Sequence, residues 1–360
     1  MDKILDDIGN RSVAIVSNHT GVIGETHLVD TLLSRGVDVK KVFAPEHGFR
    51  GNKSDGANID DSKDEKTGLP ILSLYGSSKK PSDESLSDIE LIIFDIQDVG
   101  ARFYTYLSTL HYVMEAAAEN GKPLLVLDRP NPNGFYIDGP VMESCCTSFV
   151  GLHPVPVVYG MTIGEYAQMI NGEKWLNKGI QCNLRVISCQ NYEHSALYKL
   201  PIKPSPNLPD MTAIYWYPSL CFFEGTLVSV GRGTDRPFKI VGEPSNNSGT
   251  YSFVPESKPG ASMHPKHAGE TCVGYNLSDS LNAQNLPKKL KISWLLKMYR
   301  ESGKQEDFFK KNGYFEKLAG TTKLREQIES GTSEEAIRAT WANDLDRFKK
   351  IREKYLIYSE

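Results

Sequence analysis

The sequence lacks long hydrophobic runs and has no excess of charge of either sign. Its 360 residues include 41 Lys and Arg against 45 Asp and Glu, which gives a formal net charge of −4. A protein that binds nucleic acid usually needs a basic face, so we expect no nucleic acid among the partners. No apolar stretch reaches the roughly 20 residues that a membrane-spanning helix needs, so we expect no insertion into a membrane.

The patterns that mark several well-known kinds of site are also missing. The six cysteines form no CxxC pair and no zinc-type spacing, which favours thiols that stay reduced and pack as small buried side chains. There is no HExxH pattern for a metal, no GxGxxG after the first predicted strand, and no GxSxG turn for a hydrolase nucleophile. We therefore expect neither a metal ion nor a cofactor.

The N-terminal sequence does not have the pattern of an export signal. Its first residues, MDKILDDIGNRS, contain no basic segment followed by an apolar one. We expect a periplasmic or extracytoplasmic protein if a leader has been removed, and a cytoplasmic protein otherwise.

Short apolar runs alternate with helical segments through the first half of the chain. Strands are predicted at 12–17, 37–44, 90–95 and 123–128, and helices at 26–35, 103–120 and 162–171. The runs lack the alternation of a sheet with one exposed face, so they indicate a parallel sheet covered on both faces. The predicted fold class is α/β, with a doubly wound parallel sheet.

The length exceeds that of one typical core, so we expect two domains. Residues 201–210 contain four prolines and cannot form regular structure. We place the boundary there, with domains at 1–202 and 203–360. In the second domain, apolar residues recur every three or four positions over 334–356, which predicts an amphipathic helix.

Each predicted strand of this sheet ends in a polar, turn-rich cluster. The clusters read SNHTG at 17–21, APEHGFRG at 44–51, FDIQDVGARFYTY at 94–106 and LDRPNPNG at 127–134. Ligands of open α/β sheets bind beyond the carboxyl ends of the strands. The sequence therefore predicts a site built from these turns.

Glu46 is the first candidate for chemistry. It follows a strand, and a carboxyl group at that position faces the predicted crevice, where partial burial would let it donate or accept a proton. A carboxylate that only caps a surface turn is the alternative. The flanking Pro45, Gly48 and Gly51 impose an unusual backbone and favour the functional interpretation.

The turn after the third strand holds two aspartates with Gln97 and Arg102 beside them. Asp95 and Asp98 lie three residues apart, so they either cap the next helix, bind sugar hydroxyls or hold a metal through oxygen ligands.

Further charged groups follow along the chain. Arg129 offers a fork suited to a carboxylate or phosphate, or it ties its loop to neighbouring carbonyl groups. Glu165 lies three residues after Thr162, which is the spacing of a capping box. Glu224 follows an apolar run. Arg232, Asp235 and Arg236 lie among glycines after another such run, and they form either an anion-binding loop or a salt-bridged hairpin. The tyrosines of 103–106 and 215–217 either stack on sugar rings or belong to the core.

Eight motifs in order carry a resemblance to a known family. They are SNHTGV (17–22), APEHGFRG (44–51), LYG (74–76), FDIQDVGARFYTY (94–106), LDRPNPNG (127–134), GMTIGEYA (160–167), PSPNLP (204–209) and FEGTLVSVGRGTDRPF (223–238). The set resembles the NamZ-type exo-β-N-acetylmuramidases, a bacterial glycoside hydrolase family that was formerly uncharacterised. The resemblance covers the chain to about residue 240 and continues more weakly beyond it. It departs at 133–135, where a more glycine-rich turn is expected.

The resemblance implies a Rossmann-like N-terminal domain, a smaller α+β C-terminal domain and a cleft between them. The implied reaction releases N-acetylmuramic acid from the non-reducing end of peptidoglycan fragments during cell-wall turnover. It needs a carboxylic acid at the leaving oxygen and usually a second carboxylate. Glu46 is assigned as the acid/base, and Glu224, Glu165 and Asp95 are candidates for the second group, in that order. The 2-acetamido group of the substrate can also assist, which leaves one essential acid.

The predicted partner is a peptidoglycan-derived saccharide. The predicted substrate-binding residues are Asn18, His19, His47, Arg50, Asp95, Gln97, Asp98, Arg102, Tyr104, Arg129, Asn131 and Arg232, with the arginines competing for the lactyl carboxylate. Two other functions compete with this one. The first is a non-catalytic muropeptide-binding protein, and the second is a metal-dependent hydrolase of another amino-sugar bond that uses Asp95, Asp98 and His47.

Overall fold

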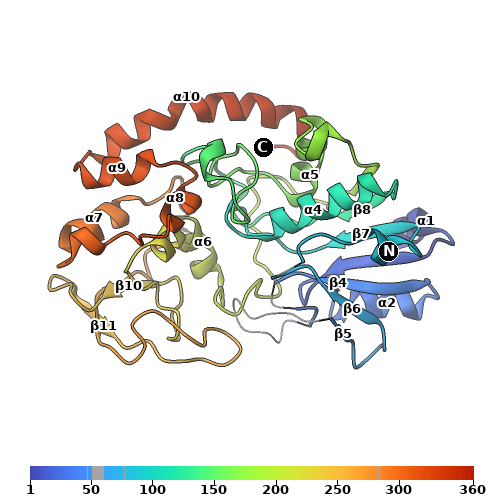
Figure 1. Cartoon of the computed structure of the whole chain (residues 1–360), viewed down its shortest axis with the longest axis horizontal. Helices are drawn as coiled ribbons and strands as arrows, with labels where there is room; N and C mark the ends of the chain where they lie inside the picture. Colours follow the sequence, from blue (N-terminus) through green and yellow to red (C-terminus); the bar gives the residue numbers. More distant parts are fainter. Residues whose placement is uncertain (47, 51–60, 77, 283) are drawn as a thin grey trace.

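The fold is known from a computed structural model, which describes residues 1–46, 48–50, 61–76, 78–282 and 284–360. A seven-stranded sheet occupies the first half of the chain, in the order β5-β6-β4-β1-β7-β8-β9 (Figure 1). Its strands are β1 (Val13–Ser17), β4 (Val39–Ala44), β5 (Ser62–Lys63), β6 (Pro70–Ser73), β7 (Leu91–Asp95), β8 (Leu124–Leu127) and β9 (Leu184–Ile187). A two-stranded ribbon, β2 (Val22–Ile23) with β3 (Thr26–His27), stands apart from it.

All neighbouring strands of the sheet run parallel except β5, which pairs antiparallel with β6 at the edge. Counted along the chain, the six parallel strands lie in the order 3-2-1-4-5-6. This is the order of the doubly wound nucleotide-binding folds, in which the direction of winding reverses beside the first strand. The prediction of a Rossmann-like doubly wound sheet is confirmed.

Both faces of the sheet are buried, as the apolar runs predicted. Val16 of β1 belongs to the core under helix α4 (Tyr106–Glu119), while its neighbour Ile15 belongs to the core under helix α2 (Leu28–Ser34). Successive side chains of a strand point to opposite faces, so a strand with helices on both sides must be apolar throughout. The remaining elements of this half are α1 (Asp2–Ile8), α3 (Asp83–Leu86), η1 (Ser144–Cys146), α5 (Ile163–Gly172) and η2 (Asn177–Gly179).

The second half is a smaller α+β unit. A three-stranded antiparallel sheet has the order β10-β12-β11, and helices lie beside it (Figure 1). Its elements are α6 (Met211–Leu220), η3 (Cys221–Gly225), β10 (Ile240–Glu243), β11 (Tyr251–Phe253), β12 (Cys272–Asn276), α7 (Ser293–Glu301), η4 (Gln305–Asp307), α8 (Tyr314–Ala319), α9 (Lys323–Glu329), α10 (Glu334–Arg352) and η5 (Glu353–Tyr355). The proline-rich stretch 201–210 contains no helix or strand.

The long helix α10 runs across the top of the molecule and returns the chain to the first half (Figure 1). Trp341, Leu345 and Phe348 are buried on one face of this helix, as the predicted amphipathic pattern requires. Beyond the helix, the Tyr358 hydroxyl donates to Asp128 Oδ2 over 2.6 Å, which fixes the C-terminal residues against the end of β8.

Two further expectations concern the cysteines and membrane-spanning helices. The six cysteines are free, and four of them are buried. Within the described residues, no helix combines the length and the hydropathy that crossing a membrane requires.

Candidate active site

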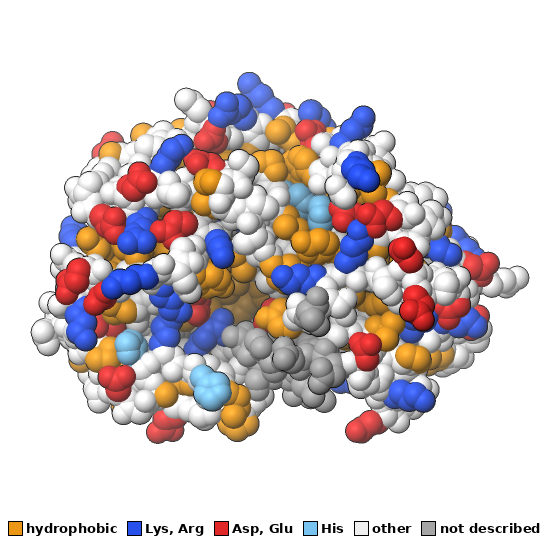
Figure 2. Space-filling view, viewed as in Figure 1, with side chains coloured by type: hydrophobic (Ala, Val, Ile, Leu, Met, Phe, Trp, Pro, Cys, Tyr) orange, Lys and Arg blue, Asp and Glu red, His pale blue; other side chains and the backbone are white. Residues whose placement is uncertain are grey.

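A cavity of about 260 Å³ lies between the two halves of the chain. The surface is hollowed near the middle of the face drawn in Figure 2. The volume is near the lower end of ligand pockets, roughly 300 Å³, which suits one small ring system better than a polymer. Its lining residues are Glu46, Tyr75, Phe103, Tyr104, Thr105, Phe149, Val150, Ser205, Asn207, Leu208, Tyr217, Cys221, Glu224, Arg232, Phe238, Tyr314 and Leu318.

Glu46 enters this cavity from the carboxyl end of β4. Strand β4 ends at Ala44, and the buried Pro45 turns the chain so that the half-buried Glu46 lines the cavity. The Thr105 hydroxyl donates to Glu46 Oε2 over 3.0 Å and fixes the carboxyl group. The position is the one that strand order predicts, because the carboxyl ends of parallel strands open onto the crevice.

Glu224 enters from the opposite half, in the short helix η3. Arg232 Nε donates to Glu224 Oε1 over 2.7 Å. Burial alone raises the pKa of the Glu224 carboxyl. The positive charges of Arg232, Lys266 and Lys310 outweigh burial and lower that pKa to about 2, so Glu224 is an anion at every physiological pH.

Lys266 is a second half-buried cation beside Glu224. Its ammonium group donates to the carbonyl oxygens of Phe223 over 2.6 Å and Val228 over 3.0 Å, which anchors the loop that carries it to η3. Burial lowers the pKa of Lys266 to about 8, with Glu224 opposing that shift. Lys266 therefore stays mostly charged near pH 7 and loses its proton within a pH unit or so above that.

Aromatic rings form a wall of the cavity. Tyr217 contacts three of them edge-on, with centroid distances of 5.4 Å to Phe103, 5.7 Å to Tyr104 and 5.0 Å to Phe238. The Tyr104 hydroxyl donates to the Pro204 carbonyl oxygen over 2.8 Å, so the proline-rich stretch is tied to this wall. Edge-on aromatic contacts hold the rings in place and leave a rigid surface for a ligand.

The aspartates of the turn after β7 lie outside the lining of the cavity. Asp95 is 1 % exposed and accepts from Arg129 Nε over 2.6 Å, so both predicted residues pair with each other. Asp98 accepts from the Tyr159 hydroxyl and from the Gly100 amide, and burial raises its pKa to about 6. Gln97 Nε2 donates to the carbonyl oxygens of Asp98 and Pro130, each over 2.8 Å.

These partners leave no obvious metal site. Within the described residues, no three side chains of His, Cys, Asp or Glu are grouped so that they could hold a metal ion. His47, the third residue of the metal hypothesis, lies outside the described residues. Asp95 joins its turn to Arg129 in the turn after β8, and Asp98 joins the same turn to Tyr159.

The two predicted asparagines, Asn18 and Asn131, hold residues and turns around the cavity without lining it. Asn18 Nδ2 donates to the Tyr106 hydroxyl over 2.8 Å, and the Tyr106 ring contacts Tyr104 at 4.8 Å. Asn131 Nδ2 donates to the Met161 carbonyl oxygen over 2.8 Å and so fixes the turn after β8. Neither asparagine lines the cavity.

Glu165 is the capping-box residue and not a neighbour of Glu46. Its carboxylate accepts from the Thr162 amide over 2.9 Å, and the Thr162 hydroxyl accepts from the Glu165 amide in return. It also accepts from His194 Nε2 over 3.1 Å and from the amides of Ile357 and Tyr358. Glu165 is fully buried and its donors are all structural, so we leave it out of the proposed catalytic pair.

Two of the predicted arginines are also engaged away from the cavity. Arg50 forms ion pairs with Asp30 at 3.1 Å and Asp64 at 2.7 Å. Arg102 is 2 % exposed and donates to carbonyl oxygens of both halves. Its four acceptors are Pro140, Val155, Leu318 and Ala319. Of the four predicted arginines, Arg232 is the one that lines the cavity.

His19 contacts the proline-rich stretch, because its Nε2 lies 2.9 Å from the Lys203 carbonyl oxygen. His19 does not line the cavity. The sequence did not indicate three of the lining residues: Phe149, Cys221 and Tyr314. Tyr75 falls within the LYG motif but was not predicted as a site residue. Ser205 and Asn207, by contrast, fall within the PSPNLP motif, where two polar side chains among prolines were an available signal.

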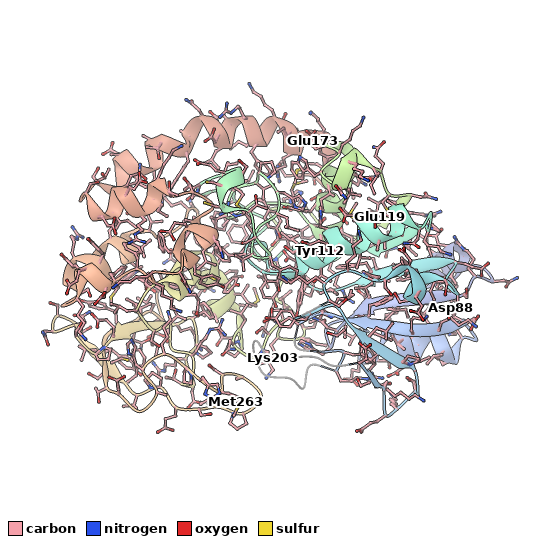
Figure 3. All side chains as sticks on the ribbon, in the orientation of Figure 1. Asp88, Tyr112, Glu119, Glu173, Lys203 and Met263 are labelled. Carbon is pink, nitrogen blue, oxygen red and sulfur yellow. The ribbon has the colours of Figure 1, made fainter. Side chains whose placement is uncertain are left out.

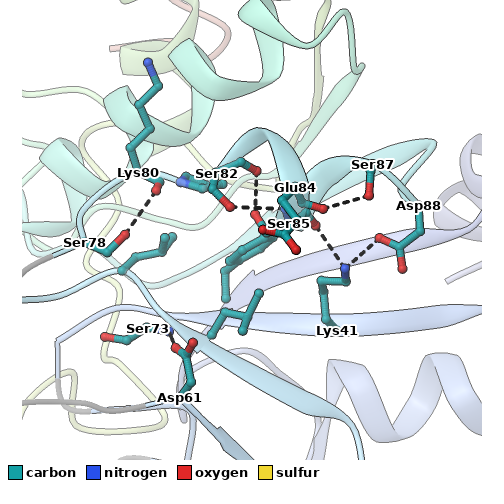
Figure 4. A pocket seen from close by; sticks show the side chains of 14 residues that line it. Lys41, Asp61, Ser73, Ser78, Lys80, Ser82, Glu84, Ser85, Ser87 and Asp88 are labelled. Carbon is teal, nitrogen blue, oxygen red and sulfur yellow. Dashed lines mark hydrogen bonds and ion pairs between the residues drawn. The ribbon is translucent and has the colours of Figure 1, made fainter.

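A second cavity, of about 640 Å³, lies beside β4, β6 and α3 (Figure 4). Lys41 in its lining donates to Asp88 over 2.6 Å and to the Ser85 carbonyl oxygen over 3.0 Å. The serines along its upper edge bond to backbone or to one another (Figure 4). No predicted site residue lines it, so we take the cavity around Glu46 as the candidate active site.

Known proteins resemble this chain over nearly its whole length. The peptidoglycan beta-N-acetylmuramidase NamZ of Bacillus subtilis strain 168 is 38% identical over 379 residues, covering 99% of this chain and 90% of that protein. A DUF1343 family crystal structure from Bacteroides fragilis NCTC 9343 is 45% identical, with a TM-score of 0.92, and the match covers 100% of this chain and 97% of that one. A second such structure from the same organism is 27% identical, with a TM-score of 0.84, covering 99% and 97%.

Two family descriptions together span nearly the whole sequence. Residues 13–212 match the family described as "Exo-beta-N-acetylmuramidase NamZ, N-terminal". Residues 215–358 match its partner, "Exo-beta-N-acetylmuramidase NamZ, C-terminal". The resemblance read from the eight motifs is confirmed, and the chain belongs to the NamZ exo-β-N-acetylmuramidase family.

Proposed function

We propose that this chain is an exo-acting glycosidase that releases N-acetylmuramic acid from the non-reducing end of peptidoglycan fragments. The observation that carries the proposal is one cavity that holds two carboxyl groups, Glu46 and Glu224, beside cations and aromatic rings. The family supports this reaction, because the B. subtilis relative is named a peptidoglycan β-N-acetylmuramidase. The small volume of the cavity suits one terminal sugar and so favours exo action.

Glu46 is the proposed acid. Hydrolysis requires a carboxylic acid that protonates the bridging oxygen while the bond from that oxygen to the anomeric carbon breaks. The Glu46 proton leaves with the departing sugar. A water molecule supplies the new hydroxyl on the anomeric carbon, and its spare proton restores the acid.

Glu224 is the proposed second carboxylate. Its pKa of about 2 makes it a weak base, so it is poorly suited to taking a proton from water. A permanent anion is well suited to stabilising the positive charge that develops on the anomeric carbon. If the 2-acetamido group of the substrate attacks that carbon instead, Glu46 is the only essential acid and Glu224 serves to orient Arg232.

The cations around Glu224 explain selection of a muramic acid. N-acetylmuramic acid differs from other amino sugars by its lactyl carboxylate. Arg232, Lys266 and Lys310 bring three positive charges to one carboxylate, which leaves this end of the cavity positive. Arg232 is the proposed direct partner, because it lines the cavity and its planar fork matches a carboxylate.

The test is incubation with the β-1,4-linked disaccharide of N-acetylmuramic acid and N-acetylglucosamine, followed by mass analysis over time. We expect the two free sugars in equal amounts. Calorimetric binding of a disaccharide that stays intact would identify a muropeptide-binding protein and overturn the proposal. Internal cleavage of a longer fragment would overturn exo action.

A further inference from the structure

Two aromatic side chains of the cavity lining, Tyr75 and Phe149, form a group with Tyr112, which contacts the Phe149 ring from outside the lining. Tyr75 follows β6, Tyr112 lies on α4 close to the middle of the molecule (Figure 3), and Phe149 follows η1. The Phe149 ring lies parallel to Tyr112, with a centroid distance of 6.2 Å and an interplanar angle of 14°. Tyr75 contacts Phe149 edge-on at 6.4 Å. We call these three residues the aromatic ledge.

Hydrogen bonds hold the backbone around Phe149 in place. It lies in a tight turn in which the amides of Ser148 and Gly151 each donate to the carbonyl oxygen of the other over 2.9 Å. The Ser108 hydroxyl of α4 donates to the Phe149 carbonyl oxygen over 2.7 Å. A side chain on such a turn is held before any ligand arrives, which lowers the entropic cost of binding to it.

The ledge belongs to the same cavity as Glu46 and lies on the half of the chain opposite to the one that carries Glu224 and Arg232. Tyr75 and Phe149 line the cavity together with Glu46, and both rings are half-buried. Glu224 and Arg232 come from the opposite half of the chain. A terminal muramic acid with its carboxylate at the cationic end and its bridging oxygen at Glu46 therefore directs its leaving group toward the ledge.

The geometry points to the aromatic ledge as the binding site for the leaving-group sugar, a 2-acetamido-2-deoxyhexose such as N-acetylglucosamine. This inference rests on the proposed function, since it assumes that the cationic end takes the muramic acid. The C–H-bearing face of a pyranose is apolar and packs against aromatic rings, while its hydroxyl groups stay in water at the rim. A half-exposed ring beside a catalytic cavity has the surface that such a contact needs.

Lys79 must move for a sugar to cover the Phe149 ring. Its ammonium lies 4.7 Å from the centroid of the Phe149 ring, and the side chain is exposed. A cation–π contact at an exposed position is weak, and the long lysine stem can swing aside. The sugar therefore replaces a weak contact with a larger apolar one.

The test compares two substrates in the full-length enzyme. The disaccharide with N-acetylglucosamine can cover the ledge, whereas methyl β-N-acetylmuramide has a leaving group too small to do so. We expect Phe149→Ala to lower kcat/KM for the disaccharide on the order of tenfold more than for the methyl glycoside, because one sugar–ring contact is lost. Phe149→Tyr keeps the ring and should restore the wild-type ratio.

Tyr251→Ala is the matched control, because Tyr251 is a half-buried aromatic of the three-stranded sheet that does not line the cavity. It should leave the ratio unchanged. An equal loss on both substrates in Phe149→Ala, or a loss on neither, would overturn the inference.

A binding measurement separates this inference from the proposed function. Saturation-transfer NMR with N-acetylglucosamine alone should show contact with the wild-type protein and a loss of contact in Phe149→Ala. This result would support the ledge even if the disaccharide is not hydrolysed. Equal contact in both proteins would overturn the ledge even if hydrolysis is observed.

Discussion

Thr105 is the N-cap residue of helix α4, and its hydroxyl donates to Glu46 Oε2 over 3.0 Å instead of capping its own helix. A threonine at a helix N-cap normally accepts from an amide of the first turn, which contributes about 1 kcal/mol to stability. Here no such bond exists at Thr105. Helix α4 therefore has no side-chain cap, and its N-cap residue instead holds Glu46, the proposed acid, just beyond the end of β4.

Replacement of Glu46 by Gln should abolish most of the activity. The amide is nearly the same size and cannot donate a proton to the leaving oxygen, so kcat should fall about 10²–10⁴-fold. Thermal unfolding should change little, because Glu46 is half-buried and, among the described residues, its carboxyl group accepts one hydrogen bond, from Thr105. Turnover of the disaccharide within a few fold of wild type would remove Glu46 from the role.

Thr105 should act through Glu46 without touching the substrate's reacting atoms. Thr105→Val removes the hydroxyl at nearly constant volume, and its stability cost should be small because the side chain does not cap α4. Loss of one hydrogen bond to the carboxyl group should lower kcat about five- to tenfold and shift the alkaline limb of the pH–rate profile, where the acid loses its proton. Thr105→Ser, which keeps the hydroxyl, should restore both; an unshifted profile in Thr105→Val would contradict this role.

Arg232 should decide which sugar is accepted. Arg232→Met keeps the aliphatic stem and removes the fork, so KM for muramides should rise about 10- to 100-fold, as expected for a lost charged hydrogen bond. Hydrolysis of the matching N-acetylglucosaminide, which has no lactyl group, should change less. Arg236→Met is the control, since Arg236 is exposed and absent from the cavity lining. Equal losses on both sugars would show that Arg232 does not read the carboxylate.

The central sheet could be predicted because its strands are continuously apolar, as in SVAIVS before Asn18. The edge strand β9 was missed, since its four residues are half-buried or exposed and carry Arg185 in the middle. The three-stranded sheet of the second half was missed as well. Its strands are only three to five residues long, too short to carry a clear alternation.

The site could be predicted only where a residue's place in the fold follows from local sequence. Glu46 follows a buried strand, so its position at the crevice was accessible. Arg102 was not, because its acceptors Leu318 and Ala319 lie more than 200 residues away and are backbone oxygens, which leave no mark in the sequence. For Glu165 the structural interpretation, a capping box, was visible in the spacing and is what the structure contains.

Glu165 should affect stability rather than turnover. Its carboxylate accepts four bonds, so Glu165→Gln places an amide donor against other donors and should cost about 2–4 kcal/mol. Burial opposes ionisation, but His194 and the amide donors lower the pKa of Glu165 below its usual 4.5. The wild-type contribution is therefore present above pH 4.5 and lost as the pH falls further. Denaturant unfolding at pH 7 and pH 4 should show a smaller acid loss in Glu165→Gln; an unchanged pH dependence would contradict the assignment.

Asp98 should give the opposite dependence on pH. Burial raises its pKa from 3.8 to about 6, so the folded state favours the protonated acid. The stability that this proton confers is complete below pH 3.8 and declines as the pH rises to 6. At about 1.4 kcal/mol per pKa unit, the loss of unfolding free energy is about 3 kcal/mol.

Asp98→Asn keeps an acceptor for Tyr159 and Gly100 but cannot ionise. Its unfolding free energy relative to wild type should therefore rise by about that amount between pH 4 and pH 7. The exposed Asp279→Asn serves as the control, and a difference that stays constant with pH would show that folding does not raise the pKa of Asp98.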